Sequence, residues 1–217
     1  MYDYALYGSR ISTLGTLGII AILLAIIATV LAFIFIVPAK RREKMGKFGK
    51  FLHDACNFKF LIVEKILQAL YIAAGFGQVT ALRASVAGAE GGCQAEIGTA
   101  SAMAAAALTH ILGGTAQQCA DAYAIALGNL LGLVCDPVAG LVEVPCVKRN
   151  VIGAVNAVSA ANMAVAGITS RIPVDEVIDA MGEVGDALPA SLRETGLGGL
   201  AATPTGVKIA QRLAQED

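Results

Sequence analysis

The chain has 217 residues, of which 56% are hydrophobic and only 15% are charged, and its formal net charge is −1. This balance gives no reason to expect a nucleic-acid-binding protein, because such proteins carry a strongly basic surface. Five cysteines are an odd number, and no cleavable signal peptide is evident, so reduced thiols that hold a metal are favoured over disulfides.

The first predicted element is a membrane-spanning helix over about residues 11–37. This stretch carries no charged residue and is longer than the ~20 residues that an α-helix needs to cross the hydrocarbon core. A basic cluster follows it, from Lys40 to Lys50, whereas Arg10 is the one basic residue before it. Positive charge stays on the cytoplasmic side, so the remainder of the chain is expected in the cytoplasm. The alternative is a wholly buried helix of a soluble protein.

Residues 48–76 mix phenylalanine and aliphatic residues with a few charges. This pattern predicts either an amphipathic helix at the membrane surface or an interrupted second membrane element, and the sequence does not decide between them. His53 and Cys56 are three residues apart and could share a helix face, but two candidate ligands do not make a metal site. Near Gly77 aromatic residues become rare, which predicts a boundary between a membrane-anchor segment, 1–77, and a domain, 78–217.

The domain is predicted to be all-α. Residues 79–89 form a connection or a first helix, and Gly91 and Gly92 then break the chain. Later boundaries follow from a capping box at Thr115 and Gln118 and from prolines. Helices are predicted at 97–112, from that capping box to about 131, from about 147 to 166, and after Pro173. No alternating strand pattern and no GxGxxG motif indicates a nucleotide-binding fold.

Three cysteines, Cys93, Cys135 and Cys146, fall at the ends of these predicted helices. Loop backbone can donate N–H groups to sulfur there, and neighbouring glycines allow a bulky inorganic group to approach. The spacing matches neither the close CxxC pattern of ferredoxins nor a zinc ribbon. By spacing alone, three buried cysteines in a core of small residues explain the pattern at least as well, and a zinc site is a further alternative.

Three segments resemble one enzyme family: GAEGGCQAEIGTASAMAAAALTHILGGT, LGNLLGLVCDPVAGLVEVPCVKRNVIGAVNA and LRETGLGGLAATPTG. They are similar to the C-terminal half of the α chain of the bacterial iron–sulfur L-serine dehydratase, from about Val79 to the C-terminus. The resemblance implies that Cys93, Cys135 and Cys146 are the three ligands of a [4Fe–4S] cluster with one iron left open, and that no pyridoxal phosphate is needed. Cys119 takes no ligand position.

The resemblance further implies an L-serine ammonia-lyase, which converts L-serine to pyruvate and ammonia with the cluster as Lewis acid. The catalytic base is not identified, because His110 fits a helix end or the surface better than an active site. The flanking polar residues are candidates for hydrogen bonds around the ligands. They are Gln94, Glu96, Asp136 and Asn150.

The family's α chain also has a first half with glycine- and asparagine-rich substrate-binding motifs, which this chain lacks. Residues 1–77 look instead like the start of an unrelated small membrane protein. We therefore expect an anchored chain that is incomplete alone and needs a β chain or the missing α-chain half. The alternatives are a membrane-anchored helical binding or structural protein without a cluster, and a lyase resembling cysteine desulfidase.

Overall fold

The computed structural model of the chain describes the backbone of residues 47–216 and the side chains of residues 61–215. The chain divides into two compact units, residues 1–64 and residues 65–217. The predicted membrane helix at 11–37 lies outside the described residues and remains a prediction from sequence. Within the part that is described, no helix combines the length and the apolar character needed to span a bilayer.

Helix α2, Lys47–Arg83, covers the whole of the predicted amphipathic stretch. The helix is confirmed, and the alternative of a second membrane element is not supported. α2 continues through Gly77 without a break, so the change of composition there does not mark a helix end. A side chain at Gly77 would come within 2.8 Å of Met103 Sδ, and the small residue thus allows α2 to approach the helix that carries Met103.

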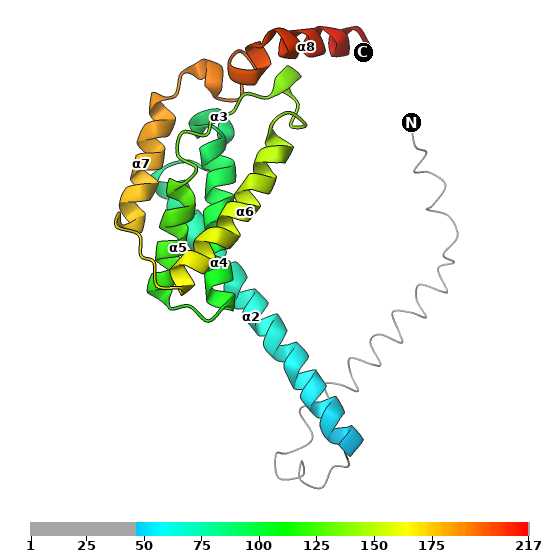
Figure 1. The fold of residues 1–217 in the computed structure, drawn as a ribbon, viewed down its shortest axis with the longest axis vertical. Helices are drawn as coiled ribbons and strands as arrows, with labels where there is room; N and C mark the ends of the chain where they lie inside the picture. Colours follow the sequence, from blue (N-terminus) through cyan, green and yellow to red (C-terminus); the bar gives the residue numbers. More distant parts are fainter. Residues whose placement is uncertain (1–46, 217) are drawn as a thin grey trace, which may run out of the picture. The chain divides into compact units, whose positions relative to one another are not determined.

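The remaining described residues form an all-helical arrangement, as predicted (Figure 1). They contain no strand, only an isolated bridge between Cys135 and Arg193. α4, α5 and α6 pack against one another, and α7 packs on α5. The elements are α3 Gly88–Gly91, the π-turn η3 Gln94–Gly98, α4 Thr99–Ile111, α5 Ala116–Gly128, η4 Val138–Gly140, α6 Cys146–Val165, α7 Val174–Ala187, η5 Ala190–Leu192, η6 Gly199–Ala202 and α8 Pro204–Glu216.

The helix boundaries follow local signals in the sequence. Thr115 Oγ1 accepts a hydrogen bond from the Gln118 backbone N–H at 3.2 Å, and Gln118 Oε1 accepts one from the Thr115 N–H at 2.9 Å. This reciprocal capping box satisfies two donors at the start of α5, as predicted. α7 begins directly after Pro173, with two acidic residues in its first turn, where the helix dipole favours them. The C-terminal helix α8 was not predicted.

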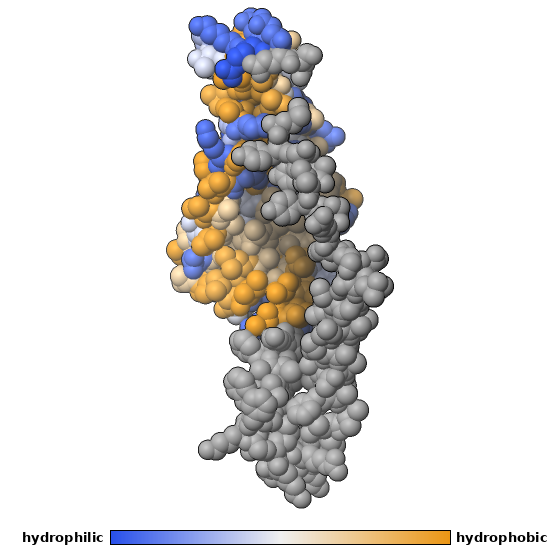
Figure 2. All heavy atoms as spheres, turned by 90° about the vertical axis from the view of Figure 1, so that its right-hand side faces the viewer, coloured by the Kyte–Doolittle hydropathy of each residue, from blue (hydrophilic) through white to orange (hydrophobic). Residues whose placement is uncertain are grey.

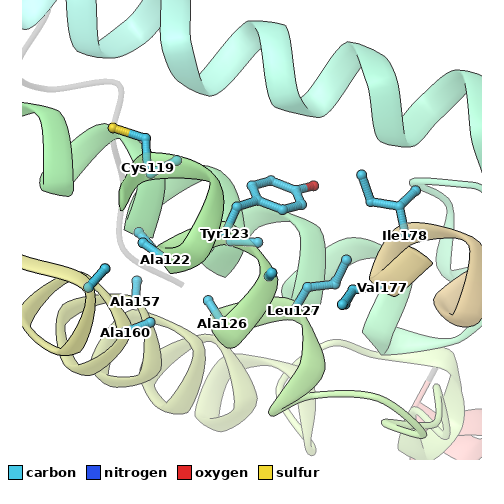
Figure 3. Packing of buried hydrophobic residues seen from close by; sticks show 14 of the residues in the cluster. Cys119, Ala122, Tyr123, Ala126, Leu127, Ala157, Ala160, Val177 and Ile178 are labelled. Carbon is cyan, nitrogen blue, oxygen red and sulfur yellow. The ribbon is translucent and has the colours of Figure 1, made fainter. Parts of the chain in front are cut away.

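The core between these helices consists largely of alanine. Figure 3 shows Ala122 and Ala126 of α5 directed toward α6, which carries Ala157 and Ala160. Because a methyl group is short, the helix backbones can approach closely and still exclude water. The fully or almost fully buried alanines of this cluster are Ala102, Ala105, Ala106, Ala122, Ala124, Ala126, Ala157, Ala160 and Ala164.

Tyr123 of α5 makes the buried polar contact between α2 and this core. Tyr123 is fully buried, and its ring stacks on Phe76 with the centroids 4.8 Å apart. Its hydroxyl shares a hydrogen bond of 2.5 Å with Thr80 Oγ1, so the polar end of the ring is satisfied inside the apolar core. α2 is therefore fixed to α5 by one aromatic pair and one buried hydrogen bond.

Candidate metal centre

The three cysteines that the sequence singles out lie together in the structure. The sulfur atoms of Cys93, Cys135 and Cys146 are all within 4.8 Å of one another. Cys93 is 0% exposed and Cys135 is 2% exposed, whereas Cys146 is partly buried, and all three are free thiols. Three sulfur atoms at this separation form a group that can hold a metal ion or a metal cluster.

A tight turn directs Cys93 toward the segment that carries Cys135. Gly92 has a φ of 75°, a left-handed conformation that glycine adopts without strain. A side chain at Gly92 would also lie 3.0 Å from the Leu133 carbonyl oxygen, so the two backbones meet where only a glycine fits. The Gln94 N–H then donates to the Leu133 carbonyl at 2.8 Å, which holds Cys93 beside residues 133–135.

Cys135 is held by backbone hydrogen bonds to a segment near the C-terminus. Its N–H donates to the Leu192 carbonyl at 2.9 Å, and its carbonyl accepts from the Glu194 N–H at 2.8 Å. Cys146 is the first residue of α6, where the positive end of the helix dipole favours a negatively charged sulfur. Three separate parts of the chain therefore supply the three thiols.

One arginine lies beside all three segments. Arg149 Nη1 donates to the Val134 carbonyl at 2.7 Å and to Asp136 Oδ1 at 2.6 Å, and it lies 3.9 Å from Cys93 Sγ. Burial acts to lower the pKa of Arg149, but the hydrogen bond and the charge of Asp136 outweigh it and raise that pKa above the ordinary value. The guanidinium therefore stays charged.

Asp136 is 2% exposed and makes a second contact through its other carboxylate oxygen. Its Oδ2 accepts a hydrogen bond from the Leu200 N–H at 2.7 Å. Gly199 has a φ of 56°, and a side chain there would clash with the Asp136 carboxylate. The glycine-rich segment before α8 therefore closes against this carboxylate because it lacks a side chain at that point.

Two of the three thiols, those of Cys135 and Cys146, have a raised pKa. Burial, followed by the hydrogen bond and the charge of Cys93, raises the pKa of Cys135 far above the ordinary value of a thiol. Burial and the charge of Cys93 also raise the pKa of Cys146. One guanidinium does not offset three thiolates, whereas a bound metal deprotonates its thiol ligands. The donor set suits thiophilic metals, which include zinc and the iron of iron–sulfur clusters.

A cavity of about 440 Å³ opens beside two of the thiols. Cys135 and Cys146 form part of its wall, together with Glu96, Asn150 and Glu194. Glu96 and Asn150 were candidates from the sequence, but Glu194 was missed. Glu194 lies within the LRETG stretch of the resemblance, yet no spacing rule places it beside a cysteine that is distant in the chain. The cavity gives a small polar molecule access to the group of thiols.

Gln94, Asn150 and His110, the further candidates from the sequence, make hydrogen bonds within the fold. Gln94 is fully buried and bonds to backbone atoms of Met181 and Gly132 at 3.0 and 2.8 Å. Asn150 Nδ2 donates to the Cys146 carbonyl within α6 at 3.0 Å. His110 lies in the last turn of α4, about 16 Å along the helix from its first residue, and its Nε2 is 3.2 Å from Gln68 Oε1.

Cys119 is 3% exposed and packs in the alanine core, as expected for a residue that takes no ligand position. Cys56 and His53 belong to α2, and their side chains lie outside the described ones.

The sequence profile of the family described as "Serine dehydratase alpha chain" matches residues 49–201. The chain belongs to this family. A "Probable L-serine dehydratase, alpha chain" of Latilactobacillus sakei is 62% identical over 151 residues, which are 70% of this chain and 72% of the relative. A protein of the same description from Bacillus subtilis is 63% identical over 150 residues, 69% of this chain and 50% of the relative. "L-serine dehydratase TdcG" of Escherichia coli is 47% identical over 147 residues, 67% of this chain and 32% of the relative.

Two consequences follow for the boundaries of the family region. It starts at residue 49 rather than at Val79, so the assignment of residues 49–77 to an unrelated membrane protein is not supported. The family region thus includes α2, whose Phe76 and Thr80 contact the core. The matched part also covers about half the length of the Bacillus subtilis relative, so the chain spans only part of such proteins.

Proposed function

We propose that this chain is the cluster-binding part of an L-serine ammonia-lyase, with Cys93, Cys135 and Cys146 as ligands of a [4Fe–4S] cluster. The observation that carries the proposal is the convergence of three buried or partly buried thiols in a chain whose relatives are named L-serine dehydratase alpha chains. Three cysteine ligands leave one iron of such a cluster without a protein thiolate.

When bound, the cluster would supply a Lewis acid for the hydroxyl group of serine, which is a poor leaving group. The residues of this chain have supporting roles in that reaction. Ile97, Val142 and Val147 supply apolar side chains to the wall of the cavity beside the thiols. The carboxylates of Glu96 and Glu194 line the same cavity and suit the ammonium group of an amino acid by charge.

A further protein part is needed in this proposal, either a β chain or the remaining α-chain length. The matched region covers half of the Bacillus subtilis relative. α6 also carries a row of apolar side chains that are 50–63% exposed, namely Val147, Val151, Ile152, Val155 and Val158. Figure 2, which looks onto the side of the molecule that carries α6, shows apolar residues gathered there. Such a surface is typical of a protein–protein contact.

The test is reconstitution of the full chain with ferrous iron and sulfide without oxygen, followed by metal analysis. The expected result is iron and acid-labile sulfide in equal amounts, about four of each per chain. Bound zinc without acid-labile sulfide would indicate a zinc site instead of an iron–sulfur cluster. A folded chain that takes up neither metal nor sulfide would refute the proposal.

The activity is tested on the reconstituted chain, alone and together with the rest of a family enzyme supplied as a separate polypeptide. We expect serine-dependent pyruvate from the mixture and little from the chain alone. Robust pyruvate formation by the isolated chain would show that it needs no further part. Release of sulfide from cysteine in preference to pyruvate from serine would instead favour the reaction of a cysteine desulfidase.

A further inference from the structure

We infer that Arg149, anchored by Asp136, is a positioning residue that holds the three cysteine-bearing segments together. The inference rests on the proposed function, because it concerns the same three cysteines. Arg149 is not one of the expected cluster ligands. Nothing in the spacing of the cysteines indicates it.

The geometry shows one side chain in contact with three parts of the chain. Arg149 lies on α6, three residues after Cys146, and so it moves with that cysteine. Its Nη1 donates to Val134 and to Asp136, the residues on either side of Cys135, at 2.7 and 2.6 Å. The same nitrogen lies 3.9 Å from Cys93 Sγ. One guanidinium group therefore links all three segments, in addition to the backbone hydrogen bond between Gln94 and Leu133.

The three contacts of Arg149 Nη1 differ from one another in kind. The two short hydrogen bonds use both hydrogens of Nη1, and they fix the orientation of the planar guanidinium. The longer approach to Cys93 Sγ is mainly an interaction between a positive charge and a sulfur atom. Arg149 thereby limits the movement of Cys93 relative to the other two cysteines.

Asp136 keeps the guanidinium in place. The side chains of Arg149 and Asp136 are only 16% and 3% exposed, so removal of either one leaves a largely buried charge without its partner. The second oxygen of Asp136 is held by the Leu200 N–H at 2.7 Å. The carboxylate is thus fixed from two sides. Its position in turn fixes the direction in which Arg149 points.

The experiment compares four variants of the full chain after oxygen-free reconstitution. R149M removes the charge and the hydrogen bonds, R149K keeps the charge without the planar fork, and D136N removes the anchoring charge. K148M is the matched control, because Lys148 is the exposed neighbouring cation on the same helix. The rate of cluster loss to a chelator and the reduction potential of the cluster are measured, together with thermal unfolding of the metal-free chain.

We expect R149M to lose its cluster about 10–100-fold faster than the wild type, the usual size of such effects around a metal ligand. R149K and D136N should lie between R149M and the wild type, because each keeps part of the arrangement. K148M should match the wild type. R149M should also shift the reduction potential, since a cation near a ligand sulfur has been removed.

Two results would overturn the inference while the proposed function stands. One is a folded R149M chain that keeps its cluster as long as the wild type does. The other is faster loss that only parallels a weaker metal-free fold, with an unchanged reduction potential, since that pattern belongs to a purely structural residue. A wild-type chain that takes up neither iron nor sulfide would be recognised before any variant is compared, and it would overturn both proposals.

Discussion

The alanine core and the cysteine site are built in opposite ways. In the core, methyl groups such as those of Ala105, Ala122 and Ala160 are fully buried between regular helices, and many small contacts share the stabilisation. At the cysteine site, loop segments and helix ends meet, and a few hydrogen bonds donated by Arg149 or accepted by Asp136 fix their positions. The core should therefore be sensitive to volume, and the site to the loss of single polar atoms.

The largest predicted effect is on metal binding and comes from the cysteines. Replacement of Cys93, Cys135 or Cys146 by serine should reduce bound iron to background, because a serine hydroxyl does not replace a thiolate as a cluster ligand. Metal analysis after oxygen-free reconstitution measures this effect. The fold should be nearly unaffected, because the side chains have almost the same size.

Cys119 provides the control for this comparison. It is buried in the alanine core, so Cys119→Ala should retain the metal and change only the stability of the fold. Loss of iron in Cys119→Ala, or normal iron content in Cys93→Ser, would contradict the separation between core and site.

A second prediction concerns volume in the core. Ala105 on α4 is 0% exposed, so Ala105→Leu forces extra methyl and methylene groups into a closely packed space. The expected loss of unfolding free energy is about 1–3 kcal/mol, measured by urea unfolding of the metal-free chain. Ala104→Leu, at the adjacent exposed position of α4, is the matched control and should change stability little. Equal losses in the two variants would show that this part of α4 is not closely packed.

The helices around the core could be predicted from the sequence because the signals at their ends are local. The capping box of Thr115 and Gln118, the glycines after α4 and the proline before α7 each mark a helix end within a few residues. Gly77 shows the limit of such reasoning. The change of composition near Gly77 predicted a boundary between two segments. In the structure, α2 continues through this residue and packs closely on Met103 there.

The site could be predicted only in part. The ligand role of the three cysteines was inferred from resemblance to a family. Their spacing alone was equally consistent with three buried cysteines in a core of small residues. Asp136 was a candidate because it follows Cys135, but its partners, Arg149 and Leu200, come from α6 and from the segment before α8. No local pattern records a contact between residues far apart in the chain. The contribution of Arg149 therefore became visible only in the structure.

Gln94 lies between the cysteine site and the alanine core, and its replacement tests whether the two regions depend on each other. It follows Cys93, and its side-chain amide joins Met181 of α7 to the Gly132 N–H. Gln94→Leu keeps a similar size but leaves the carbonyl of Met181, a residue that is only 1% exposed, without its donor, at a cost of about 1–2 kcal/mol. Urea unfolding measures that loss, and metal analysis shows whether the site follows. Because this residue serves both regions, we expect weaker iron retention as well; unchanged iron retention would show that the two regions are independent at this position.

The smallest predicted effect lies outside both regions, at the exposed ion pair between Arg83 of α2 and Asp179 of α7. Arg83 Nε and Nη2 donate to the Asp179 carboxylate at 2.9 and 2.5 Å. The hydrogen bond with Arg83 lowers the pKa of Asp179 below its ordinary value. A carboxylate with a lowered pKa in the folded chain stabilises the fold above the pKa of the unfolded chain. That stabilisation is lost as the pH falls through the lowered value.

Asp179→Asn should therefore be slightly less stable than the wild type near neutral pH, and the difference should shrink as the pH falls through the lowered pKa of Asp179 and disappear below it. Urea midpoints at several pH values measure it. Glu183→Gln, which removes an exposed carboxylate one turn further along α7, controls for the change of net charge. The difference should also shrink in high salt, because solvent and ions screen exposed pairs. If the stability difference between Asp179→Asn and the wild type persists in acid, Asp179 acts through packing rather than charge. The exposed side of α7 would then depend on side-chain packing, as the alanine core does.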